Sequence, residues 1–428
     1  MLDIKVIREN PELVKAGALK KRMPDRIAAV DRVLQLDGEL RALLPKIEGM
    51  RAEQKAAGKS IGKLSPSERE QYLVQQKALK DQLGLLEQTE KDLRADLDKA
   101  MLLIPNIPAP EVPEGKDDTE NQELRRVGTV PKFSFAARSH HELGEKQGWL
   151  EFERAAAIAG SRTYFLFGDL AYLHDAVLRF ACDHMIAKGF TLVDPPLLVR
   201  DFAMTGTAFF PGGEEQAYRA ERDELNLIGT SEVPTTSIHQ GEILEEDSLP
   251  KLFVARSACF RREAGTYGKD TKGLYRVHQF HKVEQVIVDI GDVERSKKHH
   301  EAITKNSEEI LQAFELPYRV VAVCGGDLGT PQIFKYDIET WMPSRNGYGE
   351  THSSSRFHEF QARRLNLRYR RKEDKKVAFC HTLNNTVIAS PRVLIALLEI
   401  HQQQDGKVRI PEALVPYMNG KKVIGKSL

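Results

Sequence analysis

Two long stretches near the N-terminus repeat apolar positions at alternating steps of three and four residues. The first contains Ile47, Met50, Gln54, Ala57, Ile61 and Leu64, and the second contains Leu79, Leu83, Leu86, Glu90, Leu93, Leu97 and Ala100. This spacing gives each of two helices a single seam along which it can pack. At 1.5 Å per residue each helix would extend roughly 50 to 57 Å. The pair therefore predicts an antiparallel coiled-coil hairpin too long and thin for a globular domain to cover.

The segment between the two seams indicates where the second helix begins. The run SPSE at residues 65–68 offers an N-cap, a proline at the first helical position and a glutamate three residues after the cap. Pro11 likewise suits the first turn of a shorter helix that precedes residue 26. Pro45 would remove a hydrogen bond inside the first arm, so it predicts either a kink or the real start of that helix.

The charge of the hairpin decides what it could bind. The whole chain has 63 Lys and Arg against 62 Asp and Glu, so only a local basic patch could attract nucleic acid. Basic residues outnumber acidic ones toward the tip: Arg51, Lys55, Lys59, Lys63, Lys77 and Lys80. A dimerisation or spacer coiled coil is the alternative to an RNA-binding arm.

A proline-rich segment, Ile104 to Pro113, cannot continue the second helix and marks a domain boundary. We divide the chain into a helical hairpin at 1–105, a linker at 106–126 and a larger domain at 127–428. Beyond Phe133 the predicted strands are consecutive, which favours an α+β fold with an antiparallel sheet flanked by helices. The chain contains no GxGxxG loop, so a nucleotide would have to bind on a scaffold other than a dinucleotide-binding one.

Residues 259–284 predict two antiparallel strands joined by a long loop, since apolar and polar residues alternate at both ends and glycines punctuate the middle. Two sets of side chains would each share a face: Arg261 with Glu263, and Arg276 with Phe280 and Glu284. An arginine for phosphate, an aromatic ring for a base and carboxylates for amines would suit a nucleotide plus a second small substrate. A solvated ribbon with cross-strand ion pairs is the alternative.

Three further motifs carry polar side chains whose role the local sequence leaves open. Thr230 and Glu232 are two residues apart and would face the same way on an extended segment, where they would offer a hydroxyl and a carboxylate to an ammonium group. The alternative is a helix N-cap with an acidic first turn. Glu350 and Ser353 would suit a hard cation such as Mg²⁺, unless they belong to a plain polar loop. Arg392 stands where a strand feeds a helix, and alone it could be a surface arginine.

The run FRRE, the glycine-rich basic loop and RVHQFHKVE together closely resemble motif 2 of the class II aminoacyl-tRNA synthetases, in the form carried by seryl-tRNA synthetases. A helix at 170–188 and a strand closing on Pro196 resemble motif 1, which forms the dimer interface in that family. The junction at Arg392 resembles motif 3. The family often has a basic residue before the motif glutamate, whereas Gly349 stands here; Lys269, Lys272 or Arg345 could supply that charge.

This resemblance extends from end to end and implies a serine–tRNA ligase. Such an enzyme forms seryl-adenylate from L-serine and ATP with Mg²⁺, and then transfers serine to the 3′ end of tRNA(Ser), with tRNA(Sec) as a further candidate acceptor. The basic hairpin would grip the long variable arm of the tRNA, usually across a homodimer.

The resemblance also implies a role for each motif residue. The catalytic residues would be Arg261, Glu284 and Arg392. Serine would contact Thr230, Glu232, Arg261, Glu284, Asn384 and Thr386. ATP would contact Arg261, Glu263, Arg276, Phe280, Glu350, Ser353 and Arg392, and Mg²⁺ would be held by Glu350 and Ser353.

Two other functions would share parts of this pattern. A synthetase-like ligase that loads an amino acid onto a carrier protein would be expected to lack the long arm and often to use zinc. A non-catalytic paralogue that binds tRNA or serves a structural purpose would be expected to lose some of four residues. All four are present: Arg261, Phe280, Glu284 and Arg392.

The cysteines and the N-terminus bear on the cellular setting. Four cysteines are widely scattered, with no CxxC pair and no Cys/His cluster at zinc spacing, so we expect neither zinc nor disulfides and a reducing, cytoplasmic setting. The N-terminus lacks a basic region followed by an apolar one, and no uninterrupted apolar run reaches membrane-spanning length. We therefore expect no contact with membranes.

Overall fold

A computed structural model describes residues 1–60, 65–265 and 273–428 of the chain, which has 428 residues. Contacts divide the chain into an N-terminal unit, Met1–Ile107, and a C-terminal unit, Pro108–Leu428. Several expectations fall on residues outside the described ranges. These are the seam positions Ile61 and Leu64, the basic residue Lys63 and the loop lysines Lys269 and Lys272.

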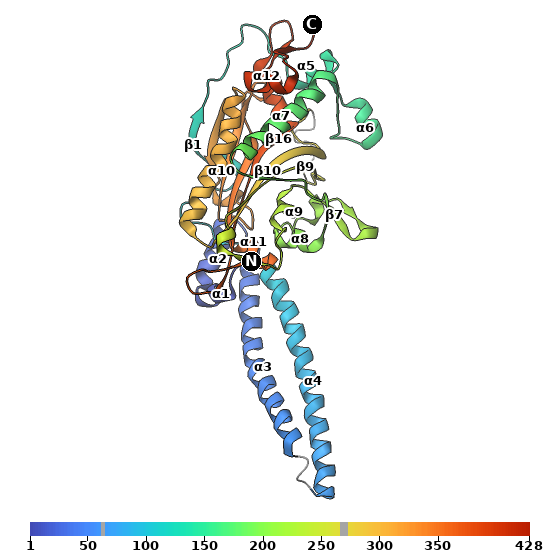
Figure 1. Ribbon diagram of the computed structural model, residues 1–428, viewed down its shortest axis with the longest axis vertical. Coiled ribbons are helices and arrows are strands. Elements are labelled where there is room, and N and C mark those ends of the chain that lie inside the picture. The colour runs from blue at the N-terminus through green and yellow to red at the C-terminus, as the bar shows by residue number, and fades with distance from the viewer. Residues whose placement is uncertain (61–64, 266–272) are drawn as a thin grey trace. The chain divides into compact units, whose positions relative to one another are not determined.

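In the residues that the structure describes, the secondary structure of the N-terminal unit consists of helices (Figure 1). Its helices are α1 (Ile4–Glu9), α2 (Pro11–Lys20), α3 (Ile27–Ser60) and α4 (Pro66–Leu103). Pro11 and Pro66 each occupy the first position of a helix, where a missing N–H costs nothing. Helix α3 runs through Pro45 without a break, so the prediction that Pro45 marks the start of the helix is wrong.

Helices α3 and α4 pack along the predicted seams as an antiparallel pair. Ile47 and Leu83 are buried together near the middle of the pair, with Met50, Leu86 and Leu93 packed against them. Toward the base, Ala100 joins a larger cluster that also contains Ile7 and Val33. Basic residues on the outer surface of the pair are exposed, among them Arg51, Lys55, Lys77 and Lys80.

The C-terminal unit is built on an eight-stranded sheet in the order β1-β11-β12-β13-β16-β10-β9-β4. Its strands are β1 (Gln122–Val127), β4 (Thr191–Val193), β9 (Lys251–Phe260), β10 (Gln279–Asp289), β11 (Tyr318–Ala322), β12 (Phe334–Met342), β13 (Gly347–His358) and β16 (His381–Ser390). Every neighbouring pair is antiparallel except β4 and β9. The predicted α+β class with a mostly antiparallel sheet is confirmed.

Two details of the sheet differ from the expectations. The last residues of the expected linker belong to strand β1, Gln122–Val127, which pairs with β11 at the edge of the sheet. The ribbon is confirmed, since β9 and β10 pair from Phe260 opposite Gln279 to Lys251 opposite Val288. However, β9 ends at Phe260 and β10 begins at Gln279. Arg261, Glu263 and Arg276 therefore lie in the connection between the two strands, and the prediction that they lie on strand faces is wrong.

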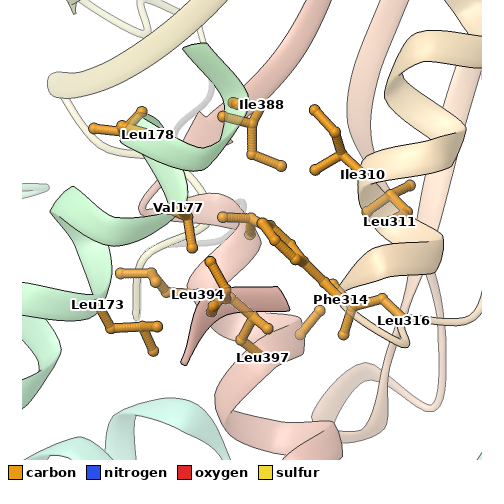
Figure 2. Packing of buried hydrophobic residues seen from close by; sticks show 14 of the residues in the cluster. Leu173, Val177, Leu178, Ile310, Leu311, Phe314, Leu316, Ile388, Leu394 and Leu397 are labelled. Carbon is orange, nitrogen blue, oxygen red and sulfur yellow. The ribbon is translucent and has the colours of Figure 1, made fainter. Parts of the chain in front are cut away.

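Three helices cover one face of this sheet and make the core (Figure 2). They are α7 (Gly168–Ala187), α10 (Val293–Ala313) and α12 (Arg392–His401). Leu173 and Val177 on α7, Ile310 on α10 and Leu397 on α12 point toward one another and toward Ile388 of β16. Burial of these side chains on one side of the sheet leaves the other side available for polar groups.

Shorter elements complete the unit. The helices are α5 (His140–Gln147), α6 (Glu153–Ala159), α8 (Asp201–Gly206), α9 (Glu232–Thr236) and α11 (Phe360–Leu365). The strands are β2 (Leu150–Glu151), β3 (Phe165–Leu166), β5 (Leu198–Arg200), β6 (Arg219–Ala220), β7 (Leu225–Leu227), β8 (Ile243–Glu245), β14 (Arg368–Arg370), β15 (Val377–Phe379), β17 (Val408–Arg409) and β18 (Val423–Ile424). Within the described ranges, no helix combines the length and the apolar character needed to cross a membrane.

Candidate active site

A cavity opens on the polar face of the large sheet, opposite the three core helices. On β10, Val283 and Ile287 belong to the core, whereas the alternate residues Phe280, Lys282 and Glu284 line the cavity. All the residues that the resemblance assigned to serine, ATP or Mg²⁺ line it as well: Thr230, Glu232, Arg261, Glu263, Arg276, Phe280, Glu284, Glu350, Ser353, Asn384, Thr386 and Arg392. Arg345, a candidate for a further phosphate contact, is not among the residues that line it. The fold thus brings together residues that span more than 160 positions of the chain.

One part of the cavity contains two buried carboxylates. Glu284 accepts a hydrogen bond from the hydroxyl of Thr386 at 3.1 Å and forms an ion pair with Lys282, whose Nζ lies 2.6 Å from Oε2. Burial, reinforced by the negative charge of Glu284, raises the pKa of Glu232 to about 7. The amide of Gln361 donates to Glu232 at 2.7 Å. Such a concentration of buried acceptors suits a small cationic or hydroxyl-bearing ligand.

Thr230 and Glu232 lie at the start of a helix and also line the cavity. Glu232 is the first residue of helix α9, and its backbone N–H donates to the hydroxyl of Thr230 at 3.2 Å. The prediction of an extended segment is therefore wrong. Both side chains nevertheless line the cavity and are buried, so the start of the helix also positions them toward a ligand.

Arginines and aromatic rings line another part of the cavity. The guanidinium of Arg261 lies over the ring of Phe280 at 5.1 Å, and its Nε donates to the carbonyl of Gly229 at 3.2 Å. Arg276 forms an ion pair with Glu263 at 3.2 Å. These contacts place planar cationic groups beside an aromatic face and suit a phosphate next to a base.

Arg392 is held at the start of α12 by backbone groups from two other segments. Its Nη1 donates to the carbonyl of Glu350 at 2.8 Å, and its Nε and Nη2 donate to the carbonyl of Tyr275 at 3.3 and 3.2 Å. Its guanidinium lies 4.3 Å from the centre of the Tyr275 ring. The arginine is therefore fixed toward the cavity rather than extended into solvent.

Glu350 and Ser353 lie on strand β13 and not in a loop. Residues three apart on a strand would ordinarily face opposite sides, but the pairing of β12 with β13 shifts by one residue beside Thr351. As a result, Glu350 and Ser353 both line the cavity. Burial alone would raise the pKa of Glu350, but the nearby positive charges of Arg392 and Lys335 outweigh it and lower the pKa.

The oxygen donors of Glu350 and Ser353 match the preference of Mg²⁺ for carboxylate and hydroxyl ligands. The lowered pKa of Glu350 also keeps its carboxylate ionised, as such an ion requires. The residues present therefore fit the expected metal, with phosphates and water left to complete its shell.

Sequence reasoning missed three residues of the site. Lys282 stands two positions before Glu284 on the same strand face, so the alternation of the strand could have indicated it. Tyr275 precedes Arg276 in the loop, and its aromatic ring next to an arginine was a weak signal. Gln361 reaches Glu232 from α11 through the tertiary fold, and no local pattern marks it.

Comparison with known families matches two parts of the chain. Residues 1–108 match the family described as the seryl-tRNA synthetase N-terminal domain. Residues 216–401 match the tRNA synthetase class II core domain (G, H, P, S and T). The second match contains all the residues named above as lining the cavity.

Relatives and solved structures are similar over the whole chain. The serine–tRNA ligase of Deinococcus radiodurans is 47% identical over 426 residues, which cover 100% of this chain and 99% of that protein. The crystal structure of seryl-tRNA synthetase from Pyrococcus horikoshii complexed with ATP has a TM-score of 0.94 at 41% identity, covering 100% of both chains. The cytoplasmic serine–tRNA ligase from Naegleria fowleri in complex with AMP has a TM-score of 0.88 at 31% identity, covering 99% of both chains.

Proposed function

This chain belongs to the seryl-tRNA synthetases, and we propose that it activates L-serine with ATP and transfers the serine to the 3′ end of tRNA(Ser). One observation carries the proposal: every residue that the resemblance assigned to serine, ATP or Mg²⁺ lines the same cavity. A substrate class inferred from motifs far apart in the chain therefore corresponds to one continuous site.

We place serine at the part of the cavity with the buried carboxylates. Thr230 and Glu232 would take its ammonium group, while Glu284 with Thr386 and Asn384 would surround its hydroxyl. The Glu284–Thr386 hydrogen bond supports this role, because a side-chain hydroxyl can join an existing network of oxygen acceptors. A site that expects a hydroxyl rejects alanine strongly, since the buried polar groups would be left without their partner, on the order of 10⁴-fold or more.

We place ATP along the arginines and aromatic rings. Phe280 and Arg392 would hold the adenine, Glu263 would meet its amino group and Arg276 would meet the outer phosphates. The ion pair between Arg276 and Glu263 would then have to open or share its charge when nucleotide enters. Glu350 and Ser353 would hold Mg²⁺, which when bound would neutralise part of the phosphate charge.

The first reaction step needs no general base, because the serine carboxylate is already ionised and attacks the α-phosphorus of ATP directly. Orientation and charge neutralisation carry the work. Arg261 would bridge the carboxylate and the α-phosphate, a task suited to its planar fork of donors. Its contacts with Phe280 and Gly229 support this role, because they fix the guanidinium before substrate arrives.

We propose that the α3–α4 hairpin binds the tRNA through phosphate contacts and shape. Exposed Lys55, Lys77 and Lys80 support an electrostatic grip on an RNA duplex, whose deep groove hides the identity of its bases. We also propose a homodimer through the motif 1 segment, α7 and β4, and a cytoplasmic setting, since all four cysteines are free and buried.

Exchange of pyrophosphate into ATP tests the proposal. Serine, threonine and alanine are supplied in parallel, and strong exchange is expected with serine alone. Glu284→Ala is expected to abolish serine-dependent exchange, with Glu284→Gln as a milder variant and Glu145→Ala, an exposed helical glutamate, as control. Near-normal exchange in Glu284→Ala would refute the assignment of the serine pocket. Charging of tRNA(Ser) and tRNA(Sec) by the active protein then separates a tRNA ligase from a carrier-protein ligase or a non-catalytic paralogue.

A further inference from the structure

A fully buried carboxylate outside the cavity links three segments that meet at the Arg392 part of the site. Glu399 lies seven residues after Arg392 on α12, about 10 Å further along the helix, and its side chain is 0% exposed. It accepts four hydrogen bonds: from the backbone N–H and Nδ1 of His140 at 2.9 and 2.7 Å, and from the backbone N–H and hydroxyl of Ser344 at 2.9 and 2.7 Å.

These bonds keep the carboxylate charged in a dry location. Burial alone would raise the pKa of Glu399, but its hydrogen bonds with His140 and Ser344 lower it. A buried anion that receives four hydrogen bonds constrains the position of each donor. His140 opens helix α5, and Ser344 belongs to the turn Pro343–Arg345.

His140 also makes a hydrogen bond to the loop that leads into β10. The backbone N–H of Leu274 donates to Nε2 of His140 at 3.2 Å, so that nitrogen carries no proton and Nδ1 is the donor to Glu399. Gly273 has a φ of +79°, and a Cβ there would collide with the imidazole of His140. The loop therefore passes the histidine in close contact immediately before Tyr275.

Tyr275 lines the cavity and lies next to the two segments that Glu399 and His140 hold, one through Leu274 and the other through Ser344 and Arg345. Its carbonyl accepts two hydrogen bonds from Arg392, and its ring lies under the guanidinium of Arg392 at 4.3 Å and of Arg345 at 4.2 Å. Arg345 follows Ser344 directly, and Leu274 precedes Tyr275 directly. The ring also fills the space beside Gly349, where an added Cβ would lie 3.1 Å from a Tyr275 carbon.

We propose that Glu399 and His140 are positioning residues for the ATP part of the site, which through Leu274 and Ser344 hold Tyr275 against Arg392 and Arg345. The inference rests on the proposed function, since it is the binding of ATP that these arginines would serve. Neither Glu399 nor His140 lines the cavity, so both act through Tyr275 and the arginines rather than on substrate.

Two substitutions at His140 separate positioning from simple packing. The amide of Asn reaches as far as Nδ1, so His140→Asn can still donate to Glu399 but cannot accept from Leu274. The amide of Gln reaches as far as Nε2, so His140→Gln can restore the acceptor for Leu274. In pyrophosphate exchange we expect His140→Asn to raise KM for ATP about tenfold, with KM for serine within twofold of wild type. His140→Gln is expected to return KM for ATP to within about threefold of wild type.

His141→Asn and His141→Gln are the matched controls, because His141 is the next residue on α5 and makes no contact with Glu399 among the described residues. Ser344→Ala provides a second route if His140→Asn does not fold, and we expect it to raise KM for ATP about threefold. Equal changes in both KM values, or lower thermal stability with unchanged KM for ATP, would overturn the inference. Failure of the wild-type protein to catalyse serine-dependent exchange would instead refute the proposed function.

Discussion

The buried pair of Lys282 and Glu284 provides a quantitative test of the electrostatics of the site. The two residues are only 6% and 2% exposed, and the ammonium lies 2.6 Å from the carboxylate. A second carboxylate, Glu232, is close enough for Glu284 to raise its pKa. Lys282→Met would leave this pair of buried acids without its cation. Removing one partner of a buried ion pair typically costs about 3–5 kcal/mol, and we predict a loss of unfolding free energy in this range.

The double variant Lys282→Met with Glu284→Gln distinguishes this cause from lost packing. When both charges are absent, neither partner of the ion pair is left buried without the other, so the double variant is predicted to be more stable than Lys282→Met alone. We expect a coupling of about 2 kcal/mol between the two sites, measured as the departure from additivity of the single changes.

Urea unfolding followed by tryptophan fluorescence suits this measurement. The chain has two tryptophans, Trp149 and Trp341, and both belong to the C-terminal unit, so the signal reports on the unit that contains the pair. Lys298→Met, at an exposed lysine of α10, is the matched control and is predicted to change stability by less than about 0.5 kcal/mol. Additive effects of the two single changes would refute the reasoning, as would a Lys282→Met variant as stable as the control.

Two further predictions concern substrate binding. Because burial and Glu284 raise the pKa of Glu232 to about 7, this carboxylate gains its charge as the pH rises from 6 to 8. If it binds the serine ammonium as proposed, KM for serine is predicted to fall over the same interval and then level off. Glu232→Gln should remove this dependence, and an unchanged pH profile in that variant would exclude Glu232 as its source. Replacing Lys55, Lys77 and Lys80 by Gln is predicted to raise KM for tRNA at least tenfold and to weaken its salt dependence, while exchange, which needs no tRNA, continues at the wild-type rate. Equal charging by this variant and the wild type at every salt concentration would contradict an electrostatic role for the arm.

The parts of the fold that the sequence predicted are those governed by local chemistry. The cap and proline at residues 65–68 indicated the start of α4, and the spacing of Ile47, Leu83 and Leu86 indicated the faces that pack. Strand alternation likewise placed Phe280 and Glu284 on one side of β10. In each case a single residue type or period determines the structure within a few positions.

The parts that were missed depend on partners distant in sequence. The register shift beside Thr351 brings Glu350 to the same side as Ser353, and it is set by pairing with β12 rather than by the residues of β13 alone. Pro45 lies within a continuous helix, because α3 gains enough from packing along α4 to tolerate one lost hydrogen bond. Gln361 reaches the site only because α11 contacts β16.

Helix α12 shows why the site and the core form one mechanical unit. Its first residue, Arg392, enters the cavity, while Leu394 and Leu397 pack in the core among α7 and α10 (Figure 2). Glu399 on the same helix accepts hydrogen bonds from His140 of α5 and from Ser344 in the turn Pro343–Arg345. A rotation of this helix would therefore move the arginine, disturb the core and break four hydrogen bonds together. Because the core resists such a rotation, the arginine is oriented before ATP binds, and little of the binding free energy is needed to order it.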